Sequence, residues 1–167
     1  MQNNNRKLNV QDLQSKIMSA CRSKIGVLDS DFLCQSVGLV GIKDPLCVSE
    51  KTTLLETINM LQKNSLGCVV VTEQSGELIG IFSERDVLIK VAAKINNLEQ
   101  QIIKDFMTLN PITISPEDPI AYALNLMSEG GFRHLPVIDE QNLPIGLISV
   151  KDIVDYIVKR YTEDLLS

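Results

Sequence analysis

The sequence contains an internal repeat, in which residues 45–88 match residues 111–154 without a gap. The match is closest near its end, where GIFSERD (80–86) corresponds to GLISVKD (146–152). Apolar positions in one copy match apolar positions in the other. A shift of one residue would turn half of each strand to the wrong face, so the common pattern indicates a common core plan. The chain is therefore expected to be one structural unit built twice.

Each copy predicts the element order β-α-β-β-α. In the second copy Asp118 is expected to cap the first helix, with Pro119 at its first position and Gly130–Gly131 at its end. Thr52–Thr53 takes the capping place in the first copy. We expect an α/β (α+β) fold in which the two units pack about a pseudo-twofold axis. The predicted strands are 47–48, 68–71 and 78–82 in the first copy and 112–114, 134–138 and 145–148 in the second.

The residues before the repeats predict a helical extension. Apolar residues recur at i, i+4 spacing from Asn9 to Gly26, which is typical of an amphipathic helix that packs on the repeats or across a dimer. A second short helix is expected between Ser30 and Gly38. The expected divisions are an N-terminal helical extension (1–40), repeat 1 (41–93), a partly helical connecting segment (94–104), repeat 2 (105–160) and a C-terminal tail (161–167).

The composition indicates a globular cytoplasmic protein, with 44% hydrophobic and 22% charged residues. A net charge of −5 and the lack of a Lys/Arg cluster argue against nucleic-acid binding. No apolar run is long enough to span a membrane, and the first residues lack the apolar stretch of a signal peptide. The four cysteines are too widely spaced for a C-x-x-C motif and are expected to be reduced and mostly buried.

The repeated segment Gly-apolar-x-Ser-x-x-Asp is the candidate functional motif. Ser83 with Asp86, and Ser149 with Asp152, have the spacing of a capping box, so one interpretation is a purely structural role at two helix starts. The other interpretation is ligand binding, because the glycine permits close backbone approach and a helix N-terminus favours an anion. A phosphate can then sit over the N–H groups at Ser149, while the Asp152 carboxylate accepts both hydroxyls of a ribose.

These segments resemble the tandem cystathionine-β-synthase (CBS) domain family, the Bateman module. The resemblance covers residues 40–158 and is carried by the repeated motif, by VVVTE (69–73) and LPVIDE (135–140), and by MTLNP (107–111). In that family the aspartate binds the ribose of an adenine nucleotide, the serine and nearby basic residues bind phosphate, and apolar residues enclose the adenine. The resemblance implies AMP, ADP or ATP as the ligand, and the sequence does not distinguish these from a dinucleotide or S-adenosylmethionine.

Transferred by position, the resemblance implies two clefts. The main cleft would use Asp152 for the ribose, Ser149, Arg133 and His134 for phosphate, and Leu46 and Leu147 for the base. The second, weaker cleft would use Asp86, Ser83, Ile112, Phe132 and Ile81. The main cleft is expected to dominate because the first copy has Gly67–Cys68 in place of Arg133–His134, and charge-assisted contacts are worth about 1.5–3 kcal/mol each. Lys151 and Arg85 are either solvated or additional phosphate partners.

The leading hypothesis is a non-catalytic regulatory module, expected to be a homodimer, in which an adenine nucleotide alters the packing of the repeats or the contacts with an effector protein. The sequence has one histidine, no nucleophile–base–orienter set and no metal-ligand cluster, which argues against an enzyme. Cys68 and His134 occupy equivalent positions, but nothing else supports a catalytic pair there. The alternative is a ligand-independent dimerisation or docking scaffold, in which the motif only caps helices.

Overall fold

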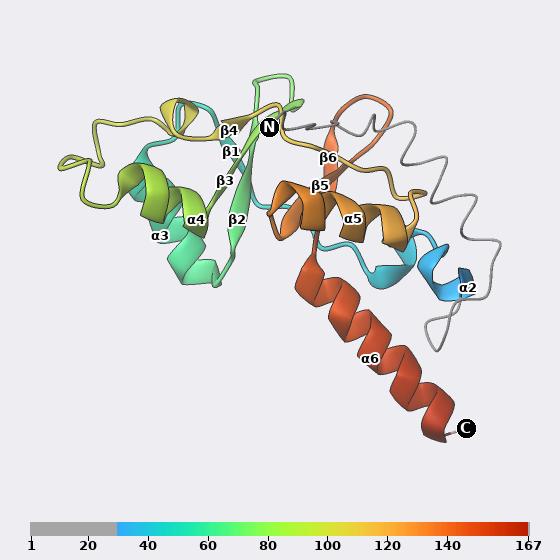
Figure 1. Cartoon of the computed structure of the whole chain (residues 1–167). Helices are drawn as coiled ribbons and strands as arrows, with labels where there is room; N and C mark the ends of the chain where they lie inside the picture. Colours follow the sequence, from blue (N-terminus) through green and yellow to red (C-terminus); the bar gives the residue numbers. More distant parts are fainter. Residues whose placement is uncertain (1–29, 167) are drawn as a thin grey trace, which may run out of the picture.

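The computed structural model describes residues 30–166 (Figure 1). The amphipathic helix predicted from Asn9 to Gly26 lies outside this range. Figure 1 shows the two repeats side by side, each with helices packed beside its own strands, and the helix α6 (Val150–Leu166) extending away from the second repeat. The described part of the chain thus has two lobes, with one repeat in each.

The larger sheet has four strands in the order β1-β2-β3-β4, of which the first repeat supplies β1, β2 and β3. Strands β1 and β2 are parallel, whereas β2 and β3, and β3 and β4, are antiparallel. The strands are β1 (Cys47–Ser49), β2 (Cys68–Thr72), β3 (Leu78–Ser83) and β4 (Thr108–Leu109). Helix α3 (Leu54–Asn64) connects β1 to β2. Helix α4 (Glu84–Asp86) follows β3 and continues as a π-helical turn over Val87–Val91.

The second repeat has the same element order with a smaller sheet. It contains α5 (Ile120–Gly130), β5 (His134–Ile138) and β6 (Pro144–Ser149). Strands β5 and β6 are antiparallel. Where a strand is predicted over 112–114, Ile114 forms a single parallel bridge to Val137. The predicted β-α-β-β-α order is therefore confirmed, with the first strand of the second copy reduced to one bridge.

Each repeat has its own hydrophobic core. The fully buried side chains at matched positions are Leu54, Val69, Val71 and Phe82 in the first repeat and Ile120, Leu135, Val137 and Ile148 in the second. Burial of an aliphatic or aromatic side chain of this size contributes about 1.5–3 kcal/mol to folding. The common core plan that the repeated apolar pattern predicts is confirmed.

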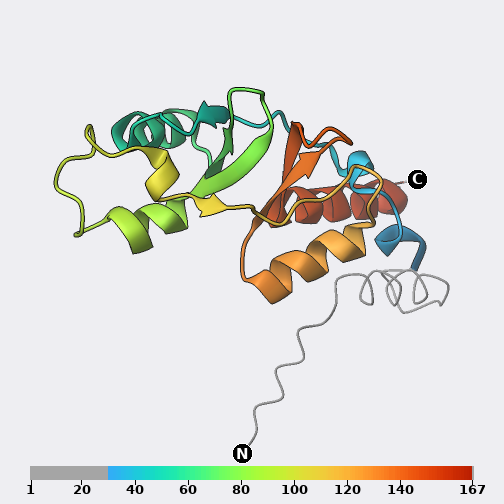
Figure 2. The ribbon, with the colours of Figure 1, turned by 90° about the horizontal axis from the view of Figure 1, so that it is seen from above.

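The start of each repeat pairs with the other repeat. Strand β4 lies at the start of the second repeat, yet it pairs with β3 of the first, with Leu109 opposite Gly80. In the same way Lys43, which precedes β1, pairs with Leu147 in β6. The Lys43 N–H donates to the Leu147 carbonyl at 3.2 Å and the Leu147 N–H donates back at 2.9 Å. Figure 2 shows these connecting segments crossing between the lobes. The exchange holds the repeats together at two places.

Helix α3 begins with a capping box. The Thr53 hydroxyl accepts from the Glu56 N–H at 3.2 Å, and the Glu56 carboxylate accepts from the Thr53 N–H at 3.1 Å. Helix α5 begins at Ile120 with Pro119 in the N-cap position, one residue later than predicted, and Gly131 ends it with a φ of 64°. The positive φ explains the glycine at that position.

The repeats differ most after their Ser-x-x-Asp segments. Helical structure in the first repeat ends at Val91, and the connection contains a 3-10 helix over Ile103–Asp105. In the second repeat α6 runs to Leu166, so most of the predicted C-terminal tail 161–167 is helical. No helix among residues 30–166 is both long enough and apolar enough to cross a membrane.

The segment before the first repeat contains two short helices instead of one. These are α2 (Ser30–Leu33) and a 3-10 helix over Val37–Val40. Cys34 lies between them and is disulfide-bonded, which corrects the expectation that all four cysteines are reduced. Cys68 is free and buried, as expected, whereas Cys47 is free and exposed.

Candidate functional site

Each copy of the motif forms a capping box. The Asp86 Oδ2 accepts from the Ser83 N–H at 2.9 Å and from the Ser83 hydroxyl at 2.7 Å, and Ser83 Oγ accepts from the Asp86 N–H at 3.3 Å. The same three contacts join Ser149 and Asp152 at 2.8, 2.5 and 3.2 Å. Both copies of the motif therefore form the capping box that their spacing predicts. Because the cap uses only Oδ2, the Oδ1 of each aspartate remains for other partners.

A cavity of about 370 Å³ is lined by residues of both repeats beside Asp86. The first repeat contributes Ser83, Arg85 and Asp86, and the second contributes Arg133 and His134. The apolar part of the lining consists of Ile81, Pro111, Ile112, Phe132 and Pro136. The cavity combines an acceptor carboxylate, basic side chains and an apolar wall. Such a combination suits a small anionic ligand that also carries hydroxyl groups and an apolar ring.

The structure brings together all five residues that the resemblance assigns to the second cleft. They are Asp86, Ser83, Ile112, Phe132 and Ile81. Arg133 and His134, which the sequence analysis assigns to the Asp152 cleft, line this same cavity. The difference arises because the stretch from Gly130 to Pro136 of the second repeat faces the motif of the first. Arg133 and His134 thus line the cavity beside Asp86, which differs from the expectation that they belong to the Asp152 cleft.

The other residues predicted for the main cleft do not line this cavity. Four of them, Leu147, Ser149, Lys151 and Asp152, lie around the start of α6. Ser149 donates its N–H to Asp152, and Lys151 pairs with Asp155. Leu147 is hydrogen-bonded to the backbone of Lys43. The fifth, Leu46, lies next to β1, and its carbonyl accepts from the Val70 N–H at 2.9 Å. None of these five residues lines the cavity beside Asp86.

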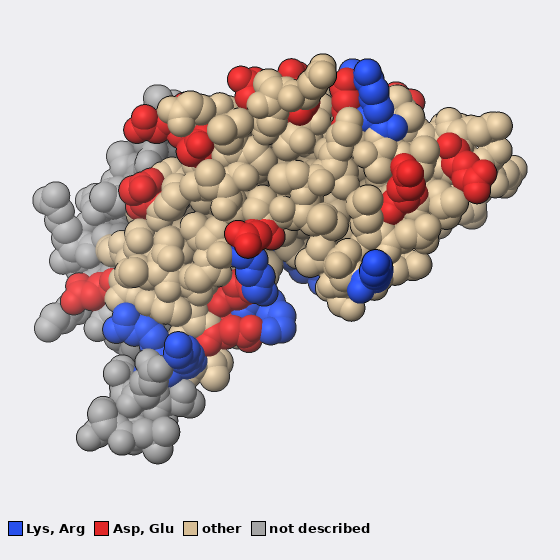
Figure 3. Space-filling model, turned by 180° about the vertical axis from the view of Figure 1, so that it is seen from behind, with Lys and Arg blue, Asp and Glu red and all other residues tan. Residues whose placement is uncertain are grey.

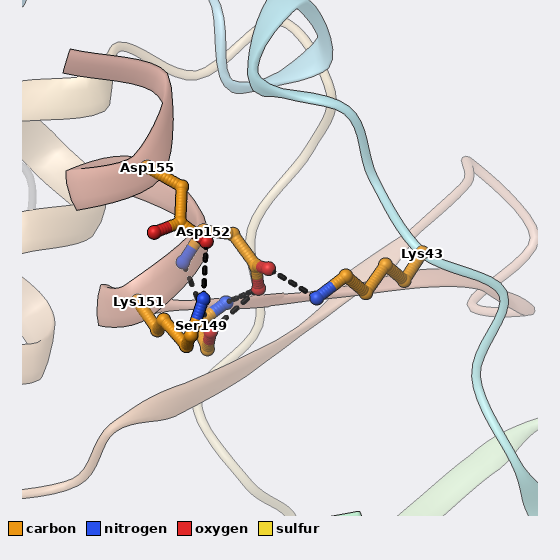
Figure 4. A network of polar contacts seen from close by, with 5 residues as sticks. All are labelled: Lys43, Ser149, Lys151, Asp152 and Asp155. Atoms are coloured by element: carbon orange, nitrogen blue, oxygen red, sulfur yellow. Dashed lines mark hydrogen bonds and ion pairs between the residues drawn. The ribbon is translucent and has the colours of Figure 1, made fainter. Parts of the chain in front are cut away.

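Asp152 has an ion-pair partner that the sequence analysis did not identify. The Lys43 ammonium contacts Asp152 Oδ1, and Figure 4 shows the lysine reaching to it from the segment before β1. Burial raises the pKa of Asp152, but the hydrogen bonds from Lys43 and Ser149 outweigh burial, so this pKa lies below its ordinary value. No local pattern indicates the pair, because its members lie 109 positions apart.

Asp86 also has a lysine partner, but a local one. The Lys90 ammonium lies 2.7 Å from Asp86 Oδ1, four residues later along the same helical segment. This pair can be identified from the i, i+4 spacing alone. The neighbouring Arg85 donates to the carbonyl of Gly131 in the other repeat. Arg85 therefore lines the cavity and also bridges the two repeats.

His134 lies between the two motifs. It lines the cavity beside Asp86, and it is directly opposite Ser149 in the pairing of β5 with β6. Its ring packs against Gly67, where an added Cβ atom would lie 2.6 Å from the ring Cε1. Gly67 is thus required for the position of the histidine ring, a role that the sequence analysis did not identify.

The protonation of His134 depends on its burial and on the charges around it. Burial lowers its pKa, Arg133 and Lys43 lower it further, and Asp152 and Glu84 raise it, with a net shift below the ordinary value. The imidazole is therefore mostly neutral at pH 7. Arg133 and Arg85 supply the permanent positive charge of the cavity.

The charged surface carries no continuous basic patch on the face shown in Figure 3. Most Lys and Arg side chains on that face lie beside Asp or Glu. Within residues 30–166, no group of three or more His, Cys, Asp or Glu side chains is arranged to hold a metal ion.

The chain belongs to the CBS domain family, whose model matches residues 37–93 and 103–159. The protein is therefore a tandem CBS domain pair. Protein MK0525 from Methanopyrus kandleri is 32% identical over 133 residues, which cover 78% of this chain and 68% of MK0525. The CBS domain-containing protein CBSCBSPB5 from Arabidopsis thaliana is 29% identical over 88% of this chain, and the match spans only 27% of its length.

A solved structure with the same fold contains a nucleotide. The CBS domain protein PAE2072 from Pyrobaculum aerophilum, complexed with AMP, is 26% identical. It superposes with a TM-score of 0.64 over 70% of this chain and 88% of that structure.

Proposed function

We propose that this CBS pair is a non-catalytic regulatory module that binds an adenine nucleotide in the cavity beside Asp86. The observation that carries the proposal is the joint lining of one cavity by Asp86, Arg85, Arg133 and His134 from two repeats. Its volume of about 370 Å³ lies within the range of about 300–1,000 Å³ typical of small-molecule sites. The AMP complex of PAE2072 supports the choice of ligand class.

Three groups of side chains in the cavity suit the three parts of an adenine nucleotide. Asp86 accepts hydrogen bonds only, so it suits the two ribose hydroxyls, which approach its Oδ1 in place of Lys90. Arg85 and Arg133 suit the phosphate, since charge-assisted contacts are the stronger hydrogen bonds. The neutral His134 imidazole has one N–H that can also donate to it. The apolar wall suits the adenine ring.

The ligand can act as a signal because it touches both repeats. A ligand shifts an equilibrium between arrangements only by its differential affinity for them. A nucleotide held by Asp86 of one repeat and Arg133 of the other favours the arrangement that brings these residues together. We propose that the effector protein, or the partner in a homodimer, binds this arrangement of the repeats in preference to others.

The proposal is tested by calorimetric titration with AMP of wild type, Asp86→Asn and Asp152→Asn. Each substitution removes the aspartate carboxylate from the capping box of one repeat, and the two boxes have the same contacts. Only Asp86 lines the cavity. Asp86→Asn should weaken AMP binding by about tenfold or more, the effect of losing one charge-assisted contact. Asp152→Asn should leave the affinity of that cavity within about threefold of wild type, below the change that one such contact makes. Equal losses in the two variants would contradict the assignment of the site.

The non-catalytic part of the proposal has its own test. Incubation with ATP should release no inorganic phosphate above the buffer control, whereas turnover would identify an enzyme. AMP, ADP and ATP should each raise the melting temperature, because a ligand at about 100 times its Kd adds roughly 2.7 kcal/mol to the stability of the folded state. A melting curve that none of the three nucleotides moves would favour the scaffold hypothesis.

A homodimer is favoured by exposed apolar side chains after both motifs. Leu88 and its matched residue Val154 are 73% and 47% exposed, and Ile89 and Val158 are exposed beside them. Exposed apolar patches on soluble proteins commonly mark interaction surfaces. We propose that a second copy covers these residues. Sedimentation of Leu88→Asp and Val154→Asp should then show dissociation, while a monomeric wild type would contradict the proposal.

A further inference from the structure

Lys43 and Asp152 form an ion pair between the start of the first repeat and the start of α6. The lysine side chain is 67% exposed, whereas the aspartate side chain is 9% exposed. The backbone of Lys43 is fixed by its two hydrogen bonds to Leu147. Any release of the pair therefore requires movement of the lysine side chain only.

The pair completes the set of partners around the Asp152 carboxylate. Oδ2 accepts from the N–H and the hydroxyl of Ser149, and Oδ1 accepts from Lys43 (Figure 4). A ribose that approaches this carboxylate must first displace the ammonium group of Lys43. That displacement removes a charge-assisted contact from a nearly buried carboxylate, which costs more than the loss of a neutral hydrogen bond.

The corresponding position at the other motif holds a residue that cannot compete. The repeat offset places Leu109 where the first repeat has Lys43, and a leucine side chain donates no hydrogen bond. Lys90 does pair with Asp86, but it also donates to the Phe106 carbonyl at 2.8 Å. Lys90 therefore keeps a hydrogen-bond partner when a ligand takes its place at Asp86.

We infer that Lys43 is a specificity-determining residue that withholds Asp152 from nucleotide, so that the chain binds one equivalent at Asp86 and excludes a second. The inference rests on the proposed function, because it concerns which of the two repeated motifs the ligand uses. The exclusion comes from within the chain, through a side chain that the first repeat supplies to the motif of the second. Removal of that side chain should open the second motif.

The test uses the full chain, AMP as the probe and the Asp86→Asn background, in which only Asp152 can receive the ribose. Lys43→Leu introduces the residue that the chain already has at position 109. The double variant Asp86→Asn/Lys43→Leu should bind AMP about tenfold more tightly than Asp86→Asn alone, because one competing charge-assisted contact is gone. Adding Asp152→Asn should abolish the gain, and Lys43→Arg in place of Lys43→Leu should give none.

A gain of binding cannot result from misfolding, and Lys43→Gln replaces Lys43→Leu where the double variant does not melt cooperatively. If wild type binds one equivalent of AMP and the double variant gains nothing, the inference about Lys43 is overturned while the proposed function stands. Two equivalents of equal affinity in wild type would overturn it as well. If wild type binds no AMP, the proposed function fails, and the inference fails with it.

Discussion

The Cγ2 methyl group of Ile42 lies so close to the α-carbon of Gly146 that a Cβ atom added there would sit 1.8 Å from it. The matched glycine, Gly80, is approached by Met107, whose Sδ would lie 2.3 Å from an added Cβ. In both cases the approaching residue comes from the start of the other repeat. The glycine of the repeated motif therefore makes room for the exchanged segment of the chain.

The two glycines should differ in their tolerance of a methyl group. Gly146→Ala should lower the free energy of unfolding by about 2–3 kcal/mol, because the β-branched side chain of Ile42 has little freedom to move away. Gly80→Ala should cost about 1 kcal/mol, since the thioether of Met107 can adopt another rotamer. Urea unfolding of the two variants measures the difference.

The matched control removes the clashing methyl group. Ile42→Leu lacks Cγ2, so the double variant Ile42→Leu/Gly146→Ala should recover part of the stability that Gly146→Ala loses. If the losses in free energy of unfolding of Ile42→Leu and Gly146→Ala simply add in the double variant, the contact between Ile42 and position 146 is not the cause of the loss in Gly146→Ala.

The internal repeat predicts much of the fold of each unit, because the apolar pattern that defines its core lies within one copy of the repeat. The apolar matches, such as Phe82 with Ile148, identify the cores of both units, and five residues assigned to the Asp86 cleft line one cavity. The exchange of the opening segments is not predictable in this way, because β4 is two residues long and its pairing partner lies far away in sequence. The placement of Arg133 and His134 depends on that exchange. Their assignment to Asp152 therefore had no support from periodicity.

The capping box at the start of α3 should contribute measurably to stability. Thr53→Ala removes the hydroxyl that accepts from the Glu56 N–H and should lower the free energy of unfolding by about 1 kcal/mol. Thr52→Ala is the matched control, because it changes the preceding threonine and leaves the box intact. A loss in the control as large as that of Thr53→Ala would assign the effect to threonine removal in general.

His134 should make the protein less stable below pH 6.5. Its pKa in the folded state lies below 6.5, so the unfolded state binds more protons between the two pKa values. The stability that the neutral imidazole contributes is complete above pH 6.5 and is lost as the pH falls toward the folded-state pKa. Between the two values the loss is at most about 1.4 kcal/mol per pH unit.

His134→Gln provides the comparison, because His134 is the single histidine of the chain. Urea unfolding at pH 7.5, 6.5 and 5.5 should show a steeper loss for wild type than for the variant. Parallel pH profiles would mean that the imidazole titrates alike in the folded and unfolded states.

Asp152 should also lose its contribution to stability as the pH falls, but at lower pH than His134 and through loss of its charged form. Its pKa is lowered in the folded state, so its contribution is present above the ordinary value of 3.8 and is lost as the pH falls through the folded-state pKa. Asp152→Asn removes the ion pair with Lys43 and weakens the cap on Ser149, and it should cost about 1–2 kcal/mol at pH 7. The difference between wild type and variant should shrink below pH 4, because the wild-type carboxyl is then protonated and loses the same partner. Lys43→Met should reproduce only the part of the loss that the ion pair causes, and a difference that stays constant from pH 7 to pH 3 would show that the charge of Asp152 does not stabilise the fold.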